Sequence, residues 1–382
     1  MNKSLRFLII VLSTIFLTGC WNYTEIDKMS LVSGMAIDKA NSGNGYEMSV
    51  EIIDVEPSDK RPTFKSVRIE SKGESIFDSI RNIINISAKK LYWAHAATVI
   101  VSKDLAKEGI LPVLDWIARD PEPRLTIYFL ISDTDNAKEI LNLQSLSTEI
   151  RSFELESMII SNRDLSKVPK IQVYELINDI STKGIYPVIP TVGPIINEGK
   201  KTMELSGGAI LKQDTLVGFI NLEDIKYYLF VRNKIKGGLL NIDLGDDNSS
   251  SKVTLEVFKS KTKITPKISD GKLSMSIKVK TQVFIGESDS ALNIIDESTI
   301  LKIKDSAEKY LEDNILLIIK KMQEDLGLDI FGFGNIVKEK IPDLWKKIEV
   351  EWDEVFKDLK IEVDADIKIM GSGHLSTVIN KK

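Results

Sequence analysis

The sequence predicts a multidomain protein of the mixed α/β (α+β) class. Two observations lead to this class: helix-like and strand-like segments intermix in the first half, whereas hairpin signals and one long amphipathic helix fill the second. The 382 residues, 43% of them apolar, suffice for two or three domains of roughly 100–200 residues, each with its own core. We expect an N-terminal mixed α/β region over residues 31–195, with room for two subdomains. A C-terminal α+β domain over residues 205–375 should pair an antiparallel sheet with the long helix.

The N-terminal region combines short apolar runs with segments of helical period. Alternating or continuous apolar residues predict strands at 31–37, 46–52, 66–71, 96–101 and 125–131, the last of them central in a sheet. Apolar residues at helical spacing predict helices at 74–87, 103–108, 113–118, 135–142, 147–160 and 171–181. The stretch 186–196 is rich in proline and β-branched residues, which predicts an edge strand or a linker.

The second half has the clearest periodic patterns of the chain. They predict, in chain order, a hairpin at 205–220, a short helix at 222–231, a flexible loop at 237–252, strands beginning at 253 and 273, a long amphipathic helix at 299–326 and an alternating strand at 361–369. Asp270-Gly271 is a strong two-residue hairpin turn. Pro342 is expected to open another helix in its first turn, where its missing N–H has no consequence.

The first twenty residues form a bacterial lipoprotein signal. Lys3 and Arg6 precede an uncharged apolar run over 7–17, which is long enough for secretion but too short to span a bilayer. Leu17-Thr18-Gly19 then leads into Cys20, the only cysteine of the chain. We predict that residues 1–19 are removed and that Cys20 carries a diacylglycerol and an N-acyl chain, with residues 20–30 as the tether. An ordinary secretory peptide with a chance cysteine, or an uncleaved anchor, remain alternatives.

Composition limits the classes of partner. The chain has 51 Lys and Arg against 56 Asp and Glu, a net charge of −5. A protein with this mixed, mildly acidic charge lacks the basic stripe that nucleic-acid binding requires. With Cys20 lipidated, no cysteine is left for an intramolecular disulfide, so the burial of apolar cores must stabilise the fold.

The residues that usually carry catalysis are scarce. The two histidines, His95 and His374, are far apart, and no H-x-x-x-H or H-E-x-x-H pair or G-x-S-x-G elbow occurs. The segment Gly193–Lys200 only superficially resembles a phosphate loop and is interpreted as a turn. We therefore expect no enzymatic activity, no catalytic or metal-binding residues and no cofactor. A carboxylate pair of the kind that glycosidases use stays open, because such a pair forms only in three dimensions.

Three further features favour structural roles. His95 is interpreted as a hydrogen-bonded structural histidine. Arg119 and Arg124, which flank Asp-Pro-Glu-Pro, are interpreted as a local ion-pair and turn arrangement, with a partner-binding surface as the alternative. Phe331-Gly332-Phe333-Gly334, after Asp329, predicts a tight turn whose aromatic rings pack in the core.

Five stretches, taken together and in order, resemble the Ger(x)C family, the lipoprotein C subunits of bacterial spore nutrient germinant receptors. They are the lipobox with Cys20-Trp21, Glu25-Ile26, Leu31-Val32-Ser33-Gly34 and Ile37-Asp38; Lys90-Leu91-Tyr92-Trp93-Ala94-His95; Leu105–Ile110 with Arg119-Asp120-Pro121-Glu122 and Arg124; Gly207–Ile210 with Leu216-Val217-Gly218 and Lys236-Gly237-Gly238; and Asp329–Gly334 with Pro342, Trp345, Trp352 and Gly371. Two departures from the family pattern lie at Ala88-Lys89 and at Ala96-Ala97-Thr98.

The resemblance implies a non-enzymatic mixed α/β protein of several domains, anchored through Cys20 to the outer face of the spore inner membrane. It also implies two integral membrane partners, a multi-span A subunit and a permease-like B subunit. From the residues alone, a lipoprotein solute-binding protein of a transporter is the competing hypothesis, because a lipobox is common in that class. A wall- or sugar-acting hydrolase is a third.

Overall fold

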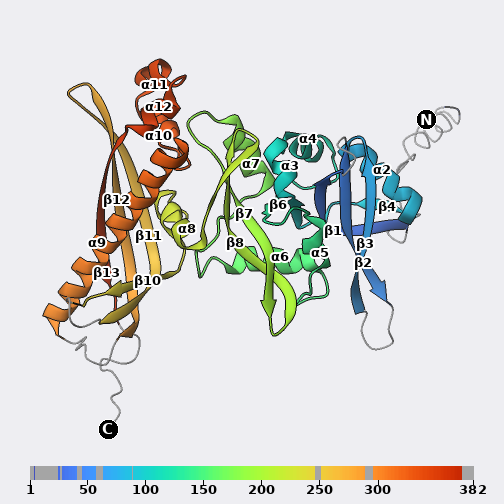
Figure 1. Ribbon diagram of the computed structural model, residues 1–382, viewed down its shortest axis with the longest axis horizontal. Coiled ribbons are helices and arrows are strands. Elements are labelled where there is room, and N and C mark those ends of the chain that lie inside the picture. The colour runs from blue at the N-terminus through green and yellow to red at the C-terminus, as the bar shows by residue number, and fades with distance from the viewer. Residues whose placement is uncertain are drawn as a thin grey trace, which may run out of the picture.

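The computed structural model describes Ser4, Glu25 and residues 28–40, 45–56, 63–87, 89–245, 251–288 and 296–371. Two β-sheets lie toward opposite ends of the long axis, and helices cover both (Figure 1). The predicted mixed α/β, multidomain class is therefore confirmed.

The first sheet has nine strands and holds most of the N-terminal region. Its order is β3-β2-β1-β5-β6-β7-β8-β9, and β4 pairs with β1. The strands are β1 (Met29–Lys39), β2 (Tyr46–Glu56), β3 (Thr63–Gly73), β4 (Lys90–Tyr92), β5 (Thr98–Val101), β6 (Tyr128–Ser132), β7 (Val188–Asn197), β8 (Lys200–Lys212) and β9 (Thr215–Ile220). The pairs β1–β5, β5–β6 and β6–β7 are parallel, whereas antiparallel strands continue the sheet on each side. The buried apolar run of β6 is central, as predicted.

The segment predicted to be an edge strand or a linker is an internal strand, so that prediction is wrong. β7 lies between β6 and β8, although β6 pairs with it only through Thr191 and Val192. This pairing is too short to involve Pro190 or Pro194. Because proline has no N–H to donate, it is tolerated where one side of a strand is left unpaired.

Helices cover both faces of this sheet. One face packs against α2 (Ile76–Ser87), α3 (Lys103–Glu108), α4 (Leu111–Arg119) and α7 (Val173–Ser181). The other face packs against α5 (Lys138–Asn142) and α6 (Arg151–Ser161). Alternation along β6 shows the two layers, since Phe129 and Ile131 face the first set of helices and Leu130 faces the second. The predicted helices are thus confirmed, with ends shifted by a few residues.

The C-terminal sheet has the order β10-β11-β12-β13. Its strands are β10 (Leu239–Asp243), β11 (Lys252–Ser269), β12 (Lys272–Ser288) and β13 (Lys360–Ile369). At the turn between β11 and β12, Asp270 and Gly271 both have positive φ, 52° and 74°, as a two-residue hairpin requires. This predicted hairpin is confirmed.

One expectation for this sheet is wrong, and another needs a correction at one strand. Residues 237–252 were predicted to be a flexible loop, yet they include β10, where the buried Leu240 and Ile242 alternate with exposed neighbours. The expected antiparallel sheet is confirmed for β10, β11 and β12, whereas β13 pairs with β12 in parallel. A parallel pair needs a long crossover, and the helical segment between β12 and β13 supplies it.

That crossover is mainly α9 (Glu297–Lys321), which continues into a π-helical turn (Met322–Leu326) and confirms the predicted long helix. α10 (Phe333–Lys340), α11 (Pro342–Ile348) and α12 (Trp352–Lys357) follow, and Pro342 opens α11 as expected. In Figure 1, α9 runs along one face of the C-terminal sheet. Its apolar stripe is buried there: Ile303, Ala307, Leu311, Ile315, Ile318 and Ile319.

Two glutamates of α9 protect the edge of this sheet. β13 is the last strand, and the backbone N–H groups of Ala365 and Ile367 donate to Glu312 Oε1 and Glu308 Oε1, each at 2.8 Å. An unprotected edge would offer these N–H groups to another chain. The carboxylates that interrupt the apolar pattern of α9 therefore cover the open edge of the sheet.

The core of the C-terminal sheet extends to the near end of the first sheet. α8 (Leu222–Val231) connects them, and the core of the C-terminal sheet includes Val188, Ile210 and Ile220 of the first sheet. The predicted boundary between 195 and 205 falls in the β7–β8 hairpin, whose strands pair up to Asn197 and Lys200. The limits 31–195 and 205–375 stay predictions.

Replacing Leu311 by alanine should lower the free energy of unfolding by about 2–5 kcal/mol, because the side chain is fully buried and its removal leaves a cavity. Leu317→Ala on the same helix is the matched control, since Leu317 is 61% exposed, and it should change stability by no more than about 0.5 kcal/mol. Urea unfolding followed by circular dichroism measures both variants. Equal losses would contradict the assignment of the buried face of α9.

Candidate functional site

The predicted lipidation site lies outside the described residues, as do Trp21 and His374. Lipidation of Cys20 therefore stays a prediction. Across the part of the chain that the structure describes, none of the helices has the apolar stretch of at least 18 residues that crossing a membrane requires.

His95 lies on an exposed turn after β4, with its ring centroid 6.0 Å from that of Tyr92. None of the hydrogen bonds formed among the described residues involves its ring, so the prediction of a hydrogen-bonded histidine is wrong. The described residues also contain no group of three or more His, Cys, Asp or Glu side chains that could hold a metal ion. The segment Gly193–Lys200 includes the turn of the β7–β8 hairpin, where Glu198 and Gly199 have φ of 48° and 77°. The predicted turn is therefore confined to Glu198 and Gly199, and residues 193–197 belong to β7.

The second and third family-like stretches meet beside α2. Lys90 forms an ion pair with Glu122, and the N–H of Glu122 donates to Asp120 Oδ1 at 3.0 Å. The predicted turn with a local ion pair is therefore present, although Arg119 pairs with Asp115 of its own helix. A cavity of about 200 Å³ lies between this turn and α2. Trp93 forms part of its wall.

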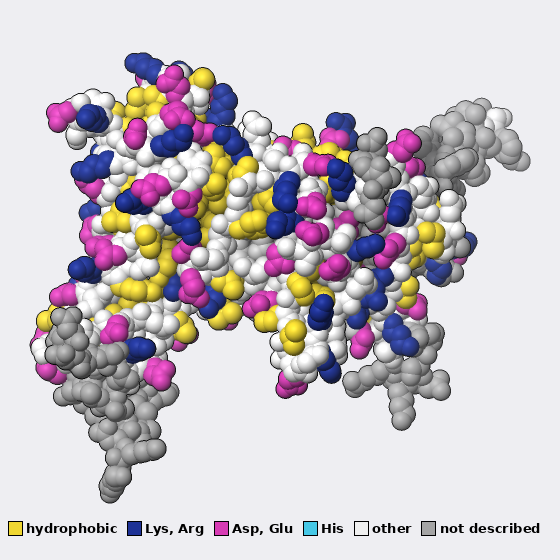
Figure 2. Space-filling view, viewed as in Figure 1, with side chains coloured by type: hydrophobic (Ala, Val, Ile, Leu, Met, Phe, Trp, Pro, Cys, Tyr) yellow, Lys and Arg dark blue, Asp and Glu magenta, His cyan; other side chains and the backbone are white. Residues whose placement is uncertain are grey.

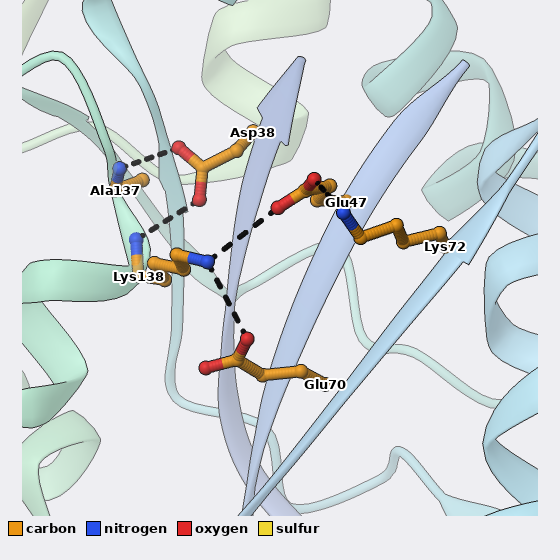
Figure 3. Close-up of polar contacts among 6 residues, drawn as sticks. All are labelled: Asp38, Glu47, Glu70, Lys72, Ala137 and Lys138. Carbon is orange, nitrogen blue, oxygen red and sulfur yellow. Dashed lines mark hydrogen bonds and ion pairs between the residues drawn. The ribbon is translucent and has the colours of Figure 1, made fainter. Parts of the chain in front are cut away.

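A layer of buried carboxylates lies between the first sheet and α5–α6. Asp38 of β1, which is 3% exposed, accepts hydrogen bonds from the N–H groups of Ala137 at 2.5 Å and Lys138 at 3.0 Å (Figure 3). Burial raises the pKa of the Asp38 carboxyl, and these hydrogen bonds oppose the rise. The carboxylate thus caps the N-terminus of α5, whose first N–H groups have no partner within the helix.

The side chain of Lys138 extends the contact to the neighbouring strands. Its Nζ lies 3.5 Å from Glu47 Oε2 and 3.4 Å from Glu70 Oε2, and Lys72 pairs with the other oxygen of Glu47 (Figure 3). The hydrogen bond from Lys72 lowers the pKa of the Glu47 carboxyl, which is itself almost buried. Lys138 therefore links α5 to β2 and β3 through charged groups.

Glu51 of β2 is the most completely bonded of these carboxylates. It is fully buried and accepts from Ser33 Oγ at 3.0 Å, Ser66 Oγ at 2.6 Å, the N–H groups of Arg151 at 2.9 Å and Ser152 at 2.8 Å, and Ser152 Oγ at 2.6 Å. One carboxylate thus joins β1, β2 and β3 to the first turn of α6.

Gly34 shows why the Ser33-Gly34 pair of the family-like stretch is needed here. A Cβ at Gly34 would collide with Ser152 Oγ and lie 2.8 Å from Thr98 Oγ1. Only glycine lets α6 approach β1 closely enough for Ser152 to reach Glu51.

Asp329 organises the fifth family-like stretch. It is fully buried and accepts from the N–H groups of Phe331 at 3.0 Å, Gly332 at 2.9 Å and Gly334 at 2.8 Å, and from Trp352 Nε1 at 3.1 Å. Burial raises the pKa of the Asp329 carboxyl to about 6, and the hydrogen bonds oppose this rise. Gly332 has a φ of 80°, which favours glycine.

The aromatic residues of this loop pack inward, as predicted. Phe331 and Phe333 are 2% and 0% exposed, and their rings stack with centroids 5.4 Å apart. A Cβ at Gly334 would lie 2.6 Å from Gly184 Cα, so glycine at both positions lets the loop pack against the chain before β7. The fifth stretch therefore holds a structural loop in place.

Sequence analysis missed Glu51. It lies between Val50 and Ile52 in an alternating strand, a pattern that predicts a solvent-exposed side chain on the polar face. The donors that satisfy it come from β1, β3 and α6. No local signal in β2 could have revealed these partners.

The arrangement of these carboxylates indicates that their role is to stabilise the fold. Each accepts hydrogen bonds from backbone or side-chain donors, and each fixes a loop or helix end onto a sheet. The fold and these groups thus define an α/β protein of two packed parts, in which buried charge sets the geometry.

Comparison with known proteins identifies the family to which this chain belongs. Residues 22–194 match the family described as spore germination protein N-terminal domain, and residues 206–373 match the one described as spore germination B3/GerAC like, C-terminal. The chain belongs to this family of spore germination proteins.

Particular relatives match over nearly their whole lengths. Spore germination protein KC of Bacillus subtilis (strain 168) is 27% identical, with 97% of this chain and 96% of that protein covered. Spore germination protein B3 of the same organism is 25% identical, with 98% and 99% covered. The crystal structure of the GerBC protein is similar in fold, with a TM-score of 0.56 and 22% sequence identity over 88% of this chain and 97% of that one.

Replacing Glu51 by glutamine should lower the free energy of unfolding by about 2–4 kcal/mol, because an amide NH₂ would face N–H and O–H donors and leave some without an acceptor. Asp54→Asn is the matched control: Asp54 lies on the same strand but is exposed, and we expect a change within about 0.5 kcal/mol. Chemical denaturation at neutral pH provides the measurement. Similar stability of E51Q and the wild type would show that the carboxylate is not needed.

Asp329→Asn should also destabilise the fold by about 2–4 kcal/mol at pH 7, since its amide cannot accept from all four donors. The pKa of Asp329 is raised in the folded state, so between its ordinary value of 3.8 and about 6 the folded protein binds more protons than the unfolded one. The contribution of Asp329 to stability therefore grows as the pH falls through this range. The difference in the free energy of unfolding between wild type and D329N should therefore increase as the pH falls from about 6 to 3.8.

Unfolding midpoints at several pH values test this dependence. Asp343→Asn serves as the control, because that side chain is 94% exposed and its removal should leave the pH profile unchanged. A gap between wild type and D329N that narrows with falling pH would contradict the raised pKa.

Proposed function

We propose that this chain is a non-enzymatic lipoprotein subunit of a spore germinant receptor, required for nutrient-triggered germination. The observation that carries the proposal is the match to both spore germination domains, in order, from residue 22 to residue 373. The alignments with spore germination proteins KC and B3 run nearly end to end, so the proposed role is that of the whole chain. Its partners in this role are a multi-span A subunit and a permease-like B subunit.

The proposal places the protein on the outer face of the spore inner membrane, held by lipid on Cys20. A single acyl chain binds a bilayer only marginally, whereas a diacylglycerol with an added N-acyl chain makes a stable anchor. β1 begins at Met29, so the chain between Cys20 and this strand reaches at most about 30 Å at ~3.4 Å per residue. In this arrangement the N-terminal end of the first sheet lies close to the membrane.

The architecture gives the transporter-binding alternative less support. A solute-binding protein of that kind needs two lobes of alternating βα units around a hinged cleft. In the described residues after 239, three consecutive strands precede α9, and a single strand follows the last helix. Residues of both halves also pack together in the core of the C-terminal sheet.

A pull-down from solubilised spore inner membranes tests the proposal. A tagged chain should recover a multi-span protein and a permease-like protein, and deletion of its gene should abolish the response to one set of nutrients while non-nutrient germination persists. Cys20→Ala is the matched control, because it removes only the acylated thiol. It should reduce both the amount recovered from spores and the nutrient response.

Recovery of transporter components, or of no partner, would contradict the receptor role. A normal nutrient response in a deletion strain that lacks related genes would also contradict it. Full membrane recovery of the Cys20→Ala variant would overturn the lipid anchor alone.

A further inference from the structure

A groove of about 730 Å³ lies where the N-terminal region meets the C-terminal part. One wall comes from α6, the turn after it and the start of α7, and the other from the end of α8 and the residues that follow. In Figure 1, α8 lies between the C-terminal sheet and strands β7 and β8 of the first sheet. Junctions between domains are frequent sites of ligand binding.

The groove has an apolar floor and wall. Ile159, Val168 and Leu229 line it and are buried, whereas Ile160 and Tyr174 line it and are 48% and 47% exposed. Half-exposed apolar side chains in a concave site can pack against the apolar part of a small ligand.

The charge of the groove is strongly one-sided. Its lining has four cations, Arg163, Lys170, Lys234 and Lys236, and one carboxylate, Glu175. Lys234 Nζ lies 3.8 Å from Glu175 Oε1, and the other oxygen of Glu175 accepts from the N–H of Gln172 at 3.1 Å. Within the described part of the chain, Arg163, Lys170 and Lys236 have no carboxylate within 4.0 Å.

The chain as a whole is not basic. The chain has a net charge of −5, and the visible face in Figure 2 shows cationic and acidic side chains interspersed. Lys167, near the groove but not part of its lining, is paired with Glu223 at 3.4 Å. Burial lowers the pKa of Lys234 and the neighbouring Arg232 lowers it further, whereas the charges of Glu175 and Asp179 oppose this shift. An anion in the groove would add a further favourable interaction with Lys234.

Two glycines hold the walls together. A Cβ at Gly237 would lie 3.0 Å from the carbonyl oxygen of Arg163, and one at Gly238, where φ is 108°, would lie 2.9 Å from that of Leu165. The N–H of Lys236 also donates to Ser166 Oγ at 3.5 Å. The Lys236-Gly237-Gly238 stretch singled out in the sequence therefore fixes one cation of the groove opposite the loop that carries Arg163.

We propose that this groove binds a small organic anion, whose carboxylate or phosphate oxygens lie among the four cations and whose apolar part packs on Ile160 and Tyr174. Arg163 suits bidentate binding of such oxygens, and the lysines supply point charges. This inference goes beyond the receptor role and does not depend on lipid anchoring.

Isothermal titration calorimetry tests the proposal on the full chain carrying Cys20→Ala in a non-ionic detergent. The probes are citrate, inorganic phosphate and a hexaglutamate peptide, each titrated at low and high salt. We expect saturable binding of citrate or phosphate with a dissociation constant below about 1 mM, weaker at high salt. Arg163→Gln and Lys236→Gln should each weaken binding about fivefold or more.

Lys167→Gln is the matched control, since it removes a neighbouring paired cation and should leave the affinity unchanged. Arg163 and Lys236 are exposed, and thermal unfolding of each variant checks that the fold persists. Saturable binding of hexaglutamate alone would overturn the small-anion proposal in favour of an acidic protein segment. Absence of saturable binding by any probe, or equal weakening by Lys167→Gln, would overturn the site itself.

Discussion

The buried carboxylate of Glu51 is the constraint on which the N-terminal half depends. A charge removed from water costs several kcal/mol unless hydrogen bonds replace its hydration, and here five donors from β1, β3 and α6 do so. Two of them are N–H groups of the first turn of α6, which lack partners within the helix. The Glu51 carboxylate therefore accepts hydrogen bonds from N–H groups of α6 that would otherwise lack a partner. Because these bonds require one geometry, the helix can dock on the sheet in only one position. Asp38 acts in the same way on α5.

In the C-terminal half, carboxylates also accept hydrogen bonds from backbone N–H groups. Asp329 gathers three backbone N–H groups and an indole N–H, and Glu308 and Glu312 bind the exposed edge of β13. This chain has one cysteine, so no disulfide can form within it. Carboxylates that accept several hydrogen bonds link segments that are distant in sequence, as disulfides do in other proteins. Their geometry is more demanding than that of apolar packing, so they also make the fold more specific.

Local pattern predicted much of this fold. The α9 stripe, the Asp270-Gly271 turn and the alternation in β13 each depend on neighbours within one or two turns of chain, and all three were recognised. The parallel pairing of β13, the internal position of β7 and the partners of Glu51 depend on contacts between distant segments, and none was predicted. The proposed anion-binding groove combines residues of α6, α7 and α8 with the residues that follow α6 and α8, so the sequence marked only its Lys236-Gly237-Gly238 stretch.

The shared core determines how the two halves can act together. Val188, Ile210 and Ile220 of the first sheet pack in one cluster with α8, α9 and the C-terminal strands, and the β7–β8 hairpin crosses the predicted domain boundary. Closely packed interiors do not deform gradually, so the halves should move as one body. A ligand in the groove between them would thus find both walls already in place. Its binding would stabilise the existing arrangement rather than close a hinge.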